Sequence, residues 1–479
     1  MFLLSRLSRS VPITFSVRQG DPLAMLLYII QLEPFLWTLH RALPGLDVAG
    51  IVELALAYVD DVNILGDDDE DIVMADGICR LFEQMSGAIL NRNRKSAILG
   101  FGTWAGRQIW PLSWLHAPPA LKVFGVTFAS SYSETVALSW AAVTAAVHQT
   151  LAFWSSRRLH TLRLRRDALE VFVFSKLWYL AQALPMPAQA AQRLTSAAGT
   201  FLWRGHLERL AWQELHRPLQ EGGLAITCVQ SRAQALWAKQ ACWTLGGEGQ
   251  AAQHLAYWLG PALGNSFPDL VRPQHAASCP PLLAALAPLL EELTTFGTVE
   301  AAHPAVVTAK GIYMAFTDTL PPPKVEFKFP DYPWPLVWRR LWRRGLPPEE
   351  ADLMFQLVHN VLPVRARLGR FTGTGVRAPC PACPDVPETV LHLFTACDRV
   401  YELWEELLAH IYIFLPAIPD DQELLLLAFA ECEREDDVTA TILAYVSVVW
   451  AARGNVRPPT FGALTATLQA RPPPFRMLW

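Results

Sequence analysis

The 479-residue sequence has little charge, and neither sign is in clear excess. Charged residues make up 18% of the chain, and 40 Lys and Arg against 44 Asp and Glu give a formal net charge of −4 at pH 7. This balance excludes a uniformly basic nucleic-acid-binding protein, so any contact with nucleic acid must come from local patches. A disordered chain is also excluded, because 52% of the residues are hydrophobic.

Cysteine is scarce and mostly scattered. Of eight cysteines, only Cys380, Cys383 and Cys397 cluster with a histidine. This usage indicates no disulfide framework and predicts an intracellular, reducing setting with one metal site. No secretory signal is expected, because the apolar start at residues 1–4 is short and arginines follow it. We find no apolar run of about 18 residues without a charge, so we expect no membrane span.

Two adjacent aspartates, Asp60 and Asp61, stand between apolar segments at residues 51–56 and 62–65. This pattern predicts a hairpin with the aspartates at its turn. Two carboxylates held together without a basic partner nearby favour a hard divalent cation, which takes oxygen ligands. The open alternative is an Asp-rich surface turn without a ligand, because Asp is a common turn former.

A second motif lies upstream. Residues 18–23 read Arg-Gln-Gly-Asp-Pro-Leu and open an apolar run over residues 26–43, where Asp21 and Pro22 suit the start of a helix. Together and in this order, this motif and the Tyr-Val-Asp-Asp motif at residues 58–61 resemble the palm of non-LTR (LINE-type) retrotransposon reverse transcriptases. The resemblance implies an α+β fold, in which a partial palm of antiparallel sheet and helices precedes a mostly α-helical thumb and C-terminal region.

The same resemblance implies an activity. RNA-directed DNA synthesis would use an RNA template, a DNA primer, deoxynucleotide triphosphates and Mg²⁺. Asp60 is then the main metal ligand and Asp61 its neighbour at the primer end. Gln19 and Gly20 are expected to contact the template and the incoming nucleotide. Lys95 is expected to balance phosphate charge, with a strand-edge lysine as the open alternative.

Two further points concern the palm. Gly125 falls in a stretch, residues 121–126, that resembles the small hairpin gripping the primer end, where glycine permits close backbone approach. Family members carry another palm aspartate on an earlier strand, and this sequence begins too close to Gln19 to include it. We therefore expect an N-terminally truncated polymerase that is inactive as this chain alone.

Five arginines form the strongest basic patch in the sequence. They lie within residues 157–166 and are Arg157, Arg158, Arg163, Arg165 and Arg166. By resemblance this stretch belongs to the thumb, where arginine–phosphate contacts hold the template–primer duplex. An exposed arginine-rich turn without a ligand is the alternative.

The cysteine cluster has the spacing Cys-x2-Cys-x8-His-x4-Cys, formed by Cys380, Cys383, His392 and Cys397. Three thiolates and an imidazole suit a closed, structural, tetrahedral Zn²⁺ site. Free thiols beside a core histidine are the competing interpretation. The pattern resembles the zinc-binding module that follows the polymerase in many such elements.

These features divide the chain into five segments. They are a partial palm (1–130), a helical thumb or connection (131–245), a helical and Pro-rich linker region (246–335), the zinc-binding module (336–415), and C-terminal helices with a tail (416–479). The rival to a polymerase is a non-catalytic nucleic-acid-binding remnant with a structural zinc site. Nothing in the sequence indicates the oligomeric state.

Overall fold

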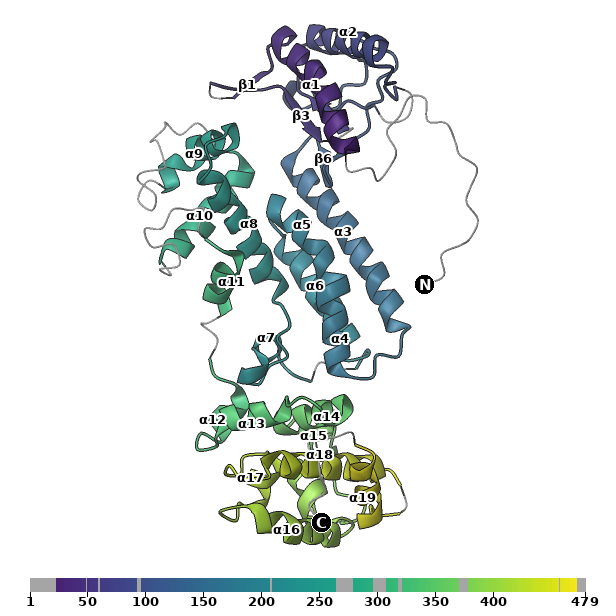
Figure 1. Cartoon of the computed structure of the whole chain (residues 1–479), viewed down its shortest axis with the longest axis vertical. Helices are drawn as coiled ribbons and strands as arrows, with labels where there is room; N and C mark the ends of the chain where they lie inside the picture. Colours follow the sequence, from purple (N-terminus) through teal and green to yellow (C-terminus); the bar gives the residue numbers. More distant parts are fainter. Residues whose placement is uncertain are drawn as a thin grey trace. The chain divides into compact units, whose positions relative to one another are not determined.

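The computed structural model of the chain divides into two compact units, each built from separate stretches of sequence (Figure 1). Unit 1 comprises residues 1–143, 179–187 and 233–315, and unit 2 comprises residues 144–178, 188–232 and 316–479. The structure describes residues 23–48, 50–58, 61–92, 96–206, 209–263, 279–295, 307–317, 321–369, 378–455 and 457–471.

Unit 1 combines short strands with helices. Its strands are β1 (Leu46–Val48), β2 (Ile51–Glu53), β3 (Ala55–Tyr58), β4 (Asp61–Ile64), β5 (Ala120–Val123) and β6 (Val126–Ala129). Its helices are α1 (Ala24–Ala42), α2 (Asp69–Ser86), η1 (Gly102–Trp104), the first half of α3 (Tyr132–Ser155), the end of α5 (Ser175–Ala183), most of α8 (Val229–Leu245), α9 (Gln250–Leu263), α10 (Pro281–Thr295) and α11 (Ala309–Thr317).

The strands of the described residues form three separate antiparallel pairs, β1–β2, β3–β4 and β5–β6. Together with the many helices this arrangement confirms the predicted α+β class. The β3–β4 pair places Tyr58 opposite Asp61, so the predicted antiparallel pair is present, and Asp60 lies outside the described residues.

A small hydrophobic core holds α1 and α2 against the β3–β4 hairpin. Leu32, Phe35 and Leu39 of α1 are buried there with Leu54 and Ile78. Cys79 packs against this cluster, and burial raises the pKa of its thiol to about 11.

The acidic run before α2 serves the start of that helix. The side chain of Asp68 accepts a hydrogen bond from the backbone N–H of Asp71, and carboxylates in a first turn favour the helix dipole. Gly87 ends the helix in the left-handed conformation. The run is thus a helix N-terminus, as its composition predicts.

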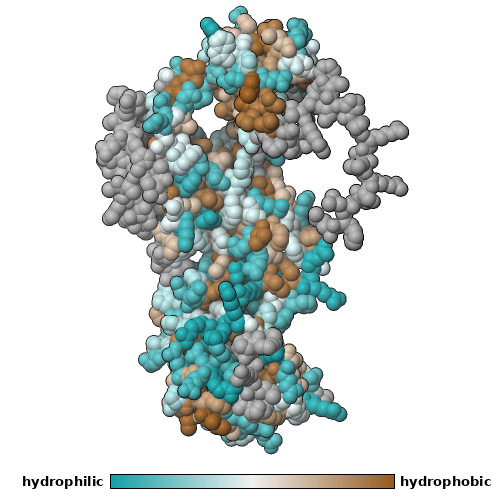
Figure 2. Space-filling model, in the orientation of Figure 1, coloured by the Kyte–Doolittle hydropathy of each residue, from teal (hydrophilic) through white to brown (hydrophobic). Residues whose placement is uncertain are grey.

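One face of α1 is hydrophobic and exposed. Its N-terminal half carries exposed Leu26, Leu27, Ile29 and Ile30, although the opposite face belongs to the core. Figure 2 shows hydrophobic surface gathered around this part of unit 1.

The regular elements of unit 2 among its described residues are helices, joined by turns and loops. It contains the rest of α3, α4 (Leu162–Ala168), η2 (Leu169–Phe174), the start of α5, α6 (Ala188–Leu202), α7 (Trp212–His216), η3 (Leu219–Glu221) and the start of α8. It continues with α12 (Lys324–Lys328), α13 (Trp334–Leu341), α14 (Pro348–Val358), α15 (Arg365–Leu368), η5 (His392–Ala396), α16 (Tyr401–Ile411), η6 (Tyr412–Phe414), α17 (Asp421–Leu425), α18 (Glu435–Ala452) and α19 (Phe461–Gln469).

Helix α3 bears on the expectation that the chain has no membrane span. It is long and apolar enough to cross a membrane, by length and composition alone, and 22% of the relevant window is buried. Ser, Thr, Gln and His interrupt its apolar residues, so it does not stand out as one apolar run in the sequence. Trp140 on this helix is buried and donates its indole N–H to the carbonyl of Pro185 over 2.8 Å. Core helices meet the same criterion, so α3 by itself does not indicate a membrane partner.

Candidate metal centre

The four predicted zinc ligands meet in unit 2. Cys380 and Cys383 lie in a tight turn whose ends are joined by a bridge between Pro379 and Pro387. Two backbone hydrogen bonds, from Cys380 N–H to Val386 O (2.8 Å) and from Val386 N–H to Cys383 O (3.0 Å), shape this turn. We call residues 378–397 the metal knuckle. Its turn directs two sulfur atoms toward one point.

The other two ligands flank a single π-helical turn. His392 is the first residue of η5, and Cys397 is the residue that ends it. A π-helix widens the turn by about one residue and is found mostly as single turns at functional sites. This turn brings an imidazole and a thiol, five positions apart, to the same side of the knuckle.

The distances fit a tetrahedral metal. The Sγ atom of Cys397 lies 3.7 Å from that of Cys380 and 3.8 Å from that of Cys383, and the four ligand atoms all lie within 4.8 Å of one another. Two sulfurs bound tetrahedrally to Zn²⁺ at about 2.3 Å are about 3.8 Å apart. A disulfide would require about 2.05 Å, so the sulfur atoms are not bonded to each other.

The buried surroundings of these ligands favour a bound cation. All four residues are buried, and His392 Nε2 has no hydrogen-bond partner among the described residues. Burial, with the neighbouring Cys380 thiol, raises the pKa of Cys397 to about 12, and burial also raises the pKa of Cys383. A bound Zn²⁺ would favour the thiolates and satisfy the imidazole nitrogen, so the donor set fits a structural zinc ion.

A buried carboxylate organises the backbone around the knuckle. Glu388 is 1% exposed, and its carboxylate accepts hydrogen bonds from the backbone N–H of Arg365 (2.8 Å) and from the guanidinium of Arg453. Sequence reasoning did not predict the pairing of Glu388 with Arg453. Spacing gives no signal for them, because 65 residues separate the two partners.

The predicted polymerase residues are only partly described. Gln19, Gly20, Asp60 and Lys95 lie outside the described residues, so their predicted roles stay predictions. Asp61 is the first residue of β4, and its side chain is exposed.

Gly125 lies in the predicted second hairpin, at the turn between β5 and β6. Its φ is +83°, and that of Phe124 is +46°. A Cβ atom at Gly125 would lie 2.7 Å from Cε1 of Tyr179, whose hydroxyl donates to Phe124 O over 2.6 Å. Glycine therefore does permit a close approach here, and Tyr179 makes it.

The five arginines of the basic patch have different surroundings. Arg157, Arg158 and Arg163 are exposed, whereas Arg166 is partly buried and lies 3.2 Å from the carboxylate of Asp167. Arg165 is 8% exposed and donates to the carbonyls of Leu159 and His160 at 2.9 and 3.3 Å. Burial, and then the nearby Arg204, lower the pKa of Arg165 to about 10. Arg165 thus supports the turn, and the exposed arginines are the ones available to phosphates.

Comparison with known proteins gives two matches. Residues 326–404 match a family described as zinc-binding in reverse transcriptase. Over 248 residues the chain is 27% identical to the "Transposon TX1 uncharacterized 149 kDa protein" of Xenopus laevis. That match covers 49% of this chain and 18% of the relative, so the chain spans less than a fifth of the relative's length. All four ligands of the metal knuckle fall inside residues 326–404.

Proposed function

We propose that this chain, a reverse-transcriptase-associated protein of the non-LTR retrotransposon type, supplies part of an RNA-directed DNA polymerase. The observation that carries the proposal is the buried Cys3His cluster, which lies within the matched zinc-binding residues. Its role is structural: with four protein ligands the site is closed and leaves no position for a substrate. Thiolate ligands also require a reducing compartment, so we place the protein inside the cell.

The nucleotide-transfer site of this proposal lies at the β3–β4 hairpin of unit 1. Asp61 is exposed at the first position of β4, where a carboxylate can reach a metal ion, and Asp60 precedes it in the sequence. Mg²⁺ bound there would stabilise the attacking and leaving oxygens of a phosphoryl transfer. Gln19, Gly20 and Lys95 would position template and nucleotide, and Gly125 would shape the surface at the primer end.

Nucleic-acid affinity would come from unit 2. Arg157, Arg158 and Arg163 are exposed within seven positions of one another at the α3–α4 connection. Contacts of such guanidinium groups with phosphates give affinity that does not depend on sequence and falls as salt rises. The partners proposed here are an RNA template and a DNA primer.

A salt titration of binding to an RNA–DNA duplex tests this part. The triple variant Arg157→Gln, Arg158→Gln, Arg163→Gln should bind more weakly, and the slope of log K against log salt should shrink by about one per lost phosphate contact. Arg193→Gln, which removes an exposed arginine on α6, should leave the slope unchanged. Binding by the wild-type chain that does not depend on salt would overturn the proposal.

Primer extension on an RNA template tests the catalytic part. We propose that this chain by itself does not incorporate nucleotides, because a two-metal site needs more carboxylate ligands than Asp60 and Asp61 supply. Incorporation that disappears in Asp60→Asn would contradict this expectation and would show that the two aspartates suffice.

A second candidate is a nucleic-acid-binding remnant with a structural zinc site and no polymerase role. The exposed arginines and the Cys3His cluster favour it, since both belong to unit 2 and neither depends on the palm. The two functions differ in one result. A palm segment that carries a further carboxylate, supplied in trans or in cis, should allow incorporation if the chain is part of a polymerase. It should leave a nucleic-acid-binding remnant inactive.

A further inference from the structure

Helix α18 lies outside the residues that match the zinc-binding family, which end at 404, yet it packs against the metal knuckle. We propose that the C-terminal end of α18 is a working part of the zinc module, and that Arg453 and Arg399 are positioning residues that couple metal binding to the docking of this helix. The inference rests on the proposed structural Zn²⁺. It also gives a role to residues that the sequence patterns leave without one.

Side chains of α18 contact the turn that carries His392. The hydroxyl of Tyr445, a fully buried residue, donates a hydrogen bond to the backbone carbonyl of Phe394 in η5. The rings of Phe394 and Trp450 are stacked, with centroids 6.5 Å apart and planes at 20°. The π-helical turn between the third and fourth ligands is therefore held from one side by α18.

An ion pair between a buried carboxylate and a partly exposed guanidinium makes the second connection. At the end of α18, Arg453 donates to the carboxylate of Glu388 through Nε (3.0 Å) and Nη2 (2.6 Å), while its Nη1 donates to Pro363 O (3.0 Å). Glu388 lies between the second and third ligands in sequence. Removing Arg453 alone would leave the charge of Glu388 buried and uncompensated, which is strongly unfavourable. The pair therefore ties the position of α18 to the chain segment between two metal ligands.

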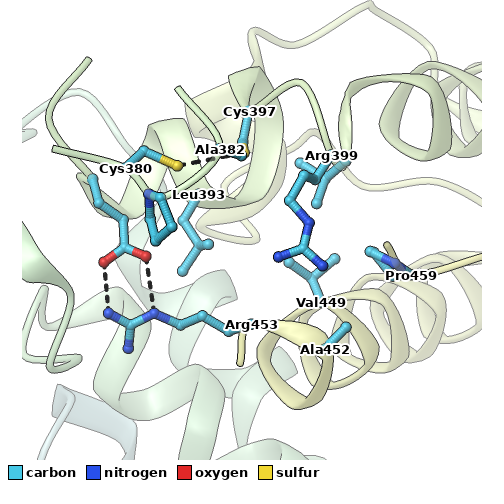
Figure 3. Close-up of a pocket in the computed structure, with 12 residues that line it drawn as sticks. Cys380, Ala382, Leu393, Cys397, Arg399, Val449, Ala452, Arg453 and Pro459 are labelled. Atoms are coloured by element: carbon cyan, nitrogen blue, oxygen red, sulfur yellow. Dashed lines mark hydrogen bonds and ion pairs between the residues drawn. The ribbon is translucent and has the colours of Figure 1, made fainter. Parts of the chain in front are cut away.

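Arg399 makes the third connection from the opposite side of the pocket (Figure 3). Arg399 follows the metal ligand Cys397 by two residues, and both residues line the same pocket. Its Nη2 donates to the carbonyls of Asn455 (2.6 Å) and Arg457 (2.9 Å), just beyond the end of α18. Arg399 thus joins the segment that carries a metal ligand to the chain leaving the helix.

The charges explain why arginines stand at this junction. Three thiolates around one Zn²⁺ leave a net negative charge, and the C-terminal end of a helix carries partial negative charge. The negatively charged metal site and the C-terminal end of α18 would repel each other across the pocket that Cys380, Cys397 and Ala452 line. Arg399 and Arg453 both line this pocket, where their positive charges offset the repulsion, and the same negative charge argues against an anionic ligand there (Figure 3).

The coupling has a reciprocal consequence. If the metal favours the docked helix, the docked helix must favour the metal by the same free energy. Substitutions of residues that orient metal ligands from outside typically cost about 10–100-fold in metal affinity. We therefore expect Arg453→Gln to weaken Zn²⁺ binding about tenfold or more and Arg453→Lys, which keeps the charge, to restore part of the loss.

The test uses the full chain and Zn²⁺ itself. Zinc affinity is measured by competition with a chromophoric chelator, and hydrogen exchange is followed at the last turn of α18, residues 449–452. In the wild type, zinc should slow exchange in this turn. In Arg453→Gln the zinc-dependent protection should shrink together with the affinity. Arg457→Gln is the matched control, because its exposed side chain lies on the same segment.

The outcomes separate the zinc site from the coupling. Absence of stoichiometric zinc binding by the wild-type chain would overturn the structural zinc site itself. The coupling alone would be overturned if Arg453→Gln bound zinc with unchanged affinity and zinc did not change hydrogen exchange at the end of α18. A variant that merely destabilises unit 2, such as Leu464→Ala on α19, should lower the melting temperature without this shift in zinc affinity.

Discussion

The imidazole Nε2 of His359 lies 2.7 Å from the backbone carbonyl oxygen of Gly222, 137 residues earlier in the chain. A carbonyl only accepts hydrogen bonds, so Nε2 carries the proton and donates. The same imidazole stacks on the ring of Trp338, with centroids 5.4 Å apart. This contact joins residues of the matched zinc-binding family to the segment between α7 and α8 within unit 2.

We predict acid-sensitive stability from His359. Burial lowers the pKa of His359 from 6.5 to about 4, whereas its hydrogen bond to Gly222 works in the opposite direction. Between these two pH values His359 is protonated in the unfolded chain but neutral in the folded chain. Stability therefore falls as the pH drops from about 6.5 to 4. At about 1.4 kcal/mol per pH unit the loss is at most about 3.5 kcal/mol, an upper bound because the ring is partly exposed.

Urea unfolding of unit 2, followed by tryptophan fluorescence at several pH values, measures this loss. In His359→Gln the side-chain amide still donates to Gly222 but does not titrate, so the variant should lose less stability than the wild type over the same pH range. Identical pH profiles for the two proteins would contradict the assignment.

Gly222 itself should resist substitution. Its φ is +78°, and an added Cβ atom would lie 2.5 Å from Cζ2 of Trp338. A side chain therefore meets both backbone strain and a buried indole, and Gly222→Ala should destabilise unit 2 by about 2 kcal/mol or more. Gly454→Ala is the control, because no atom lies within 4 Å of its added Cβ. Equal melting temperatures for the two variants would rule out this account.

Asp352 holds the arginine-rich turn in place. Its carboxylate accepts a hydrogen bond from the backbone N–H of Leu162, the first residue of α4. Burial raises the pKa of Asp352 to about 6. Asp352→Asn keeps an acceptor without the buried charge and should change stability little, whereas Asp352→Leu leaves the N–H unsatisfied and should cost about 1–3 kcal/mol.

Thermal melting distinguishes these two variants, and duplex binding adds a functional readout. Asp352→Leu should also weaken binding to an RNA–DNA duplex, because Arg157, Arg158 and Arg163 flank the disturbed helix start. A leucine variant as stable as the asparagine variant would show that Leu162 finds another partner.

Metal content gives the most direct prediction. The purified chain should hold about one Zn²⁺, since the described residues bring one Cys3His set together. Cys383→Ser should lose the metal and lower the melting temperature, and a chelator should have the same effect on the wild type. Cys432→Ser is the control, because this cysteine lies outside the cluster. Elemental analysis that finds no zinc in the wild type would contradict the proposal.

The sequence predicted the features that depend on nearby residues. The ligand spacing around Cys380 and Cys383 and the two hairpins at Asp61 and Gly125 were confirmed, because turns and knuckles are fixed by residues a few positions apart. The helix start at Asp68 likewise depends on nearby residues, since its side chain caps the backbone N–H of Asp71.

Features that depend on tertiary packing were beyond the sequence. Arg165 looks like its four neighbours in the sequence, and only the fold buries it against the carbonyls of Leu159 and His160. Glu388 and Arg453 pair over 65 positions, a separation at which no periodic pattern survives. The π-helical turns were not predicted either, because an apolar run that favours a helix does not show a wider turn within it.

The wide turn from His392 to Ala396 separates the last two ligands, so the number of residues in the turn decides whether both ligands face the metal. Each residue added to or removed from a helix rotates the next part of the chain by about 100°. A single deletion there would swing either the imidazole or the thiol away from the other three ligands, whereas a change of side chain would leave the backbone path intact. Evolution can thus substitute residues in this turn far more freely than it can insert or delete them.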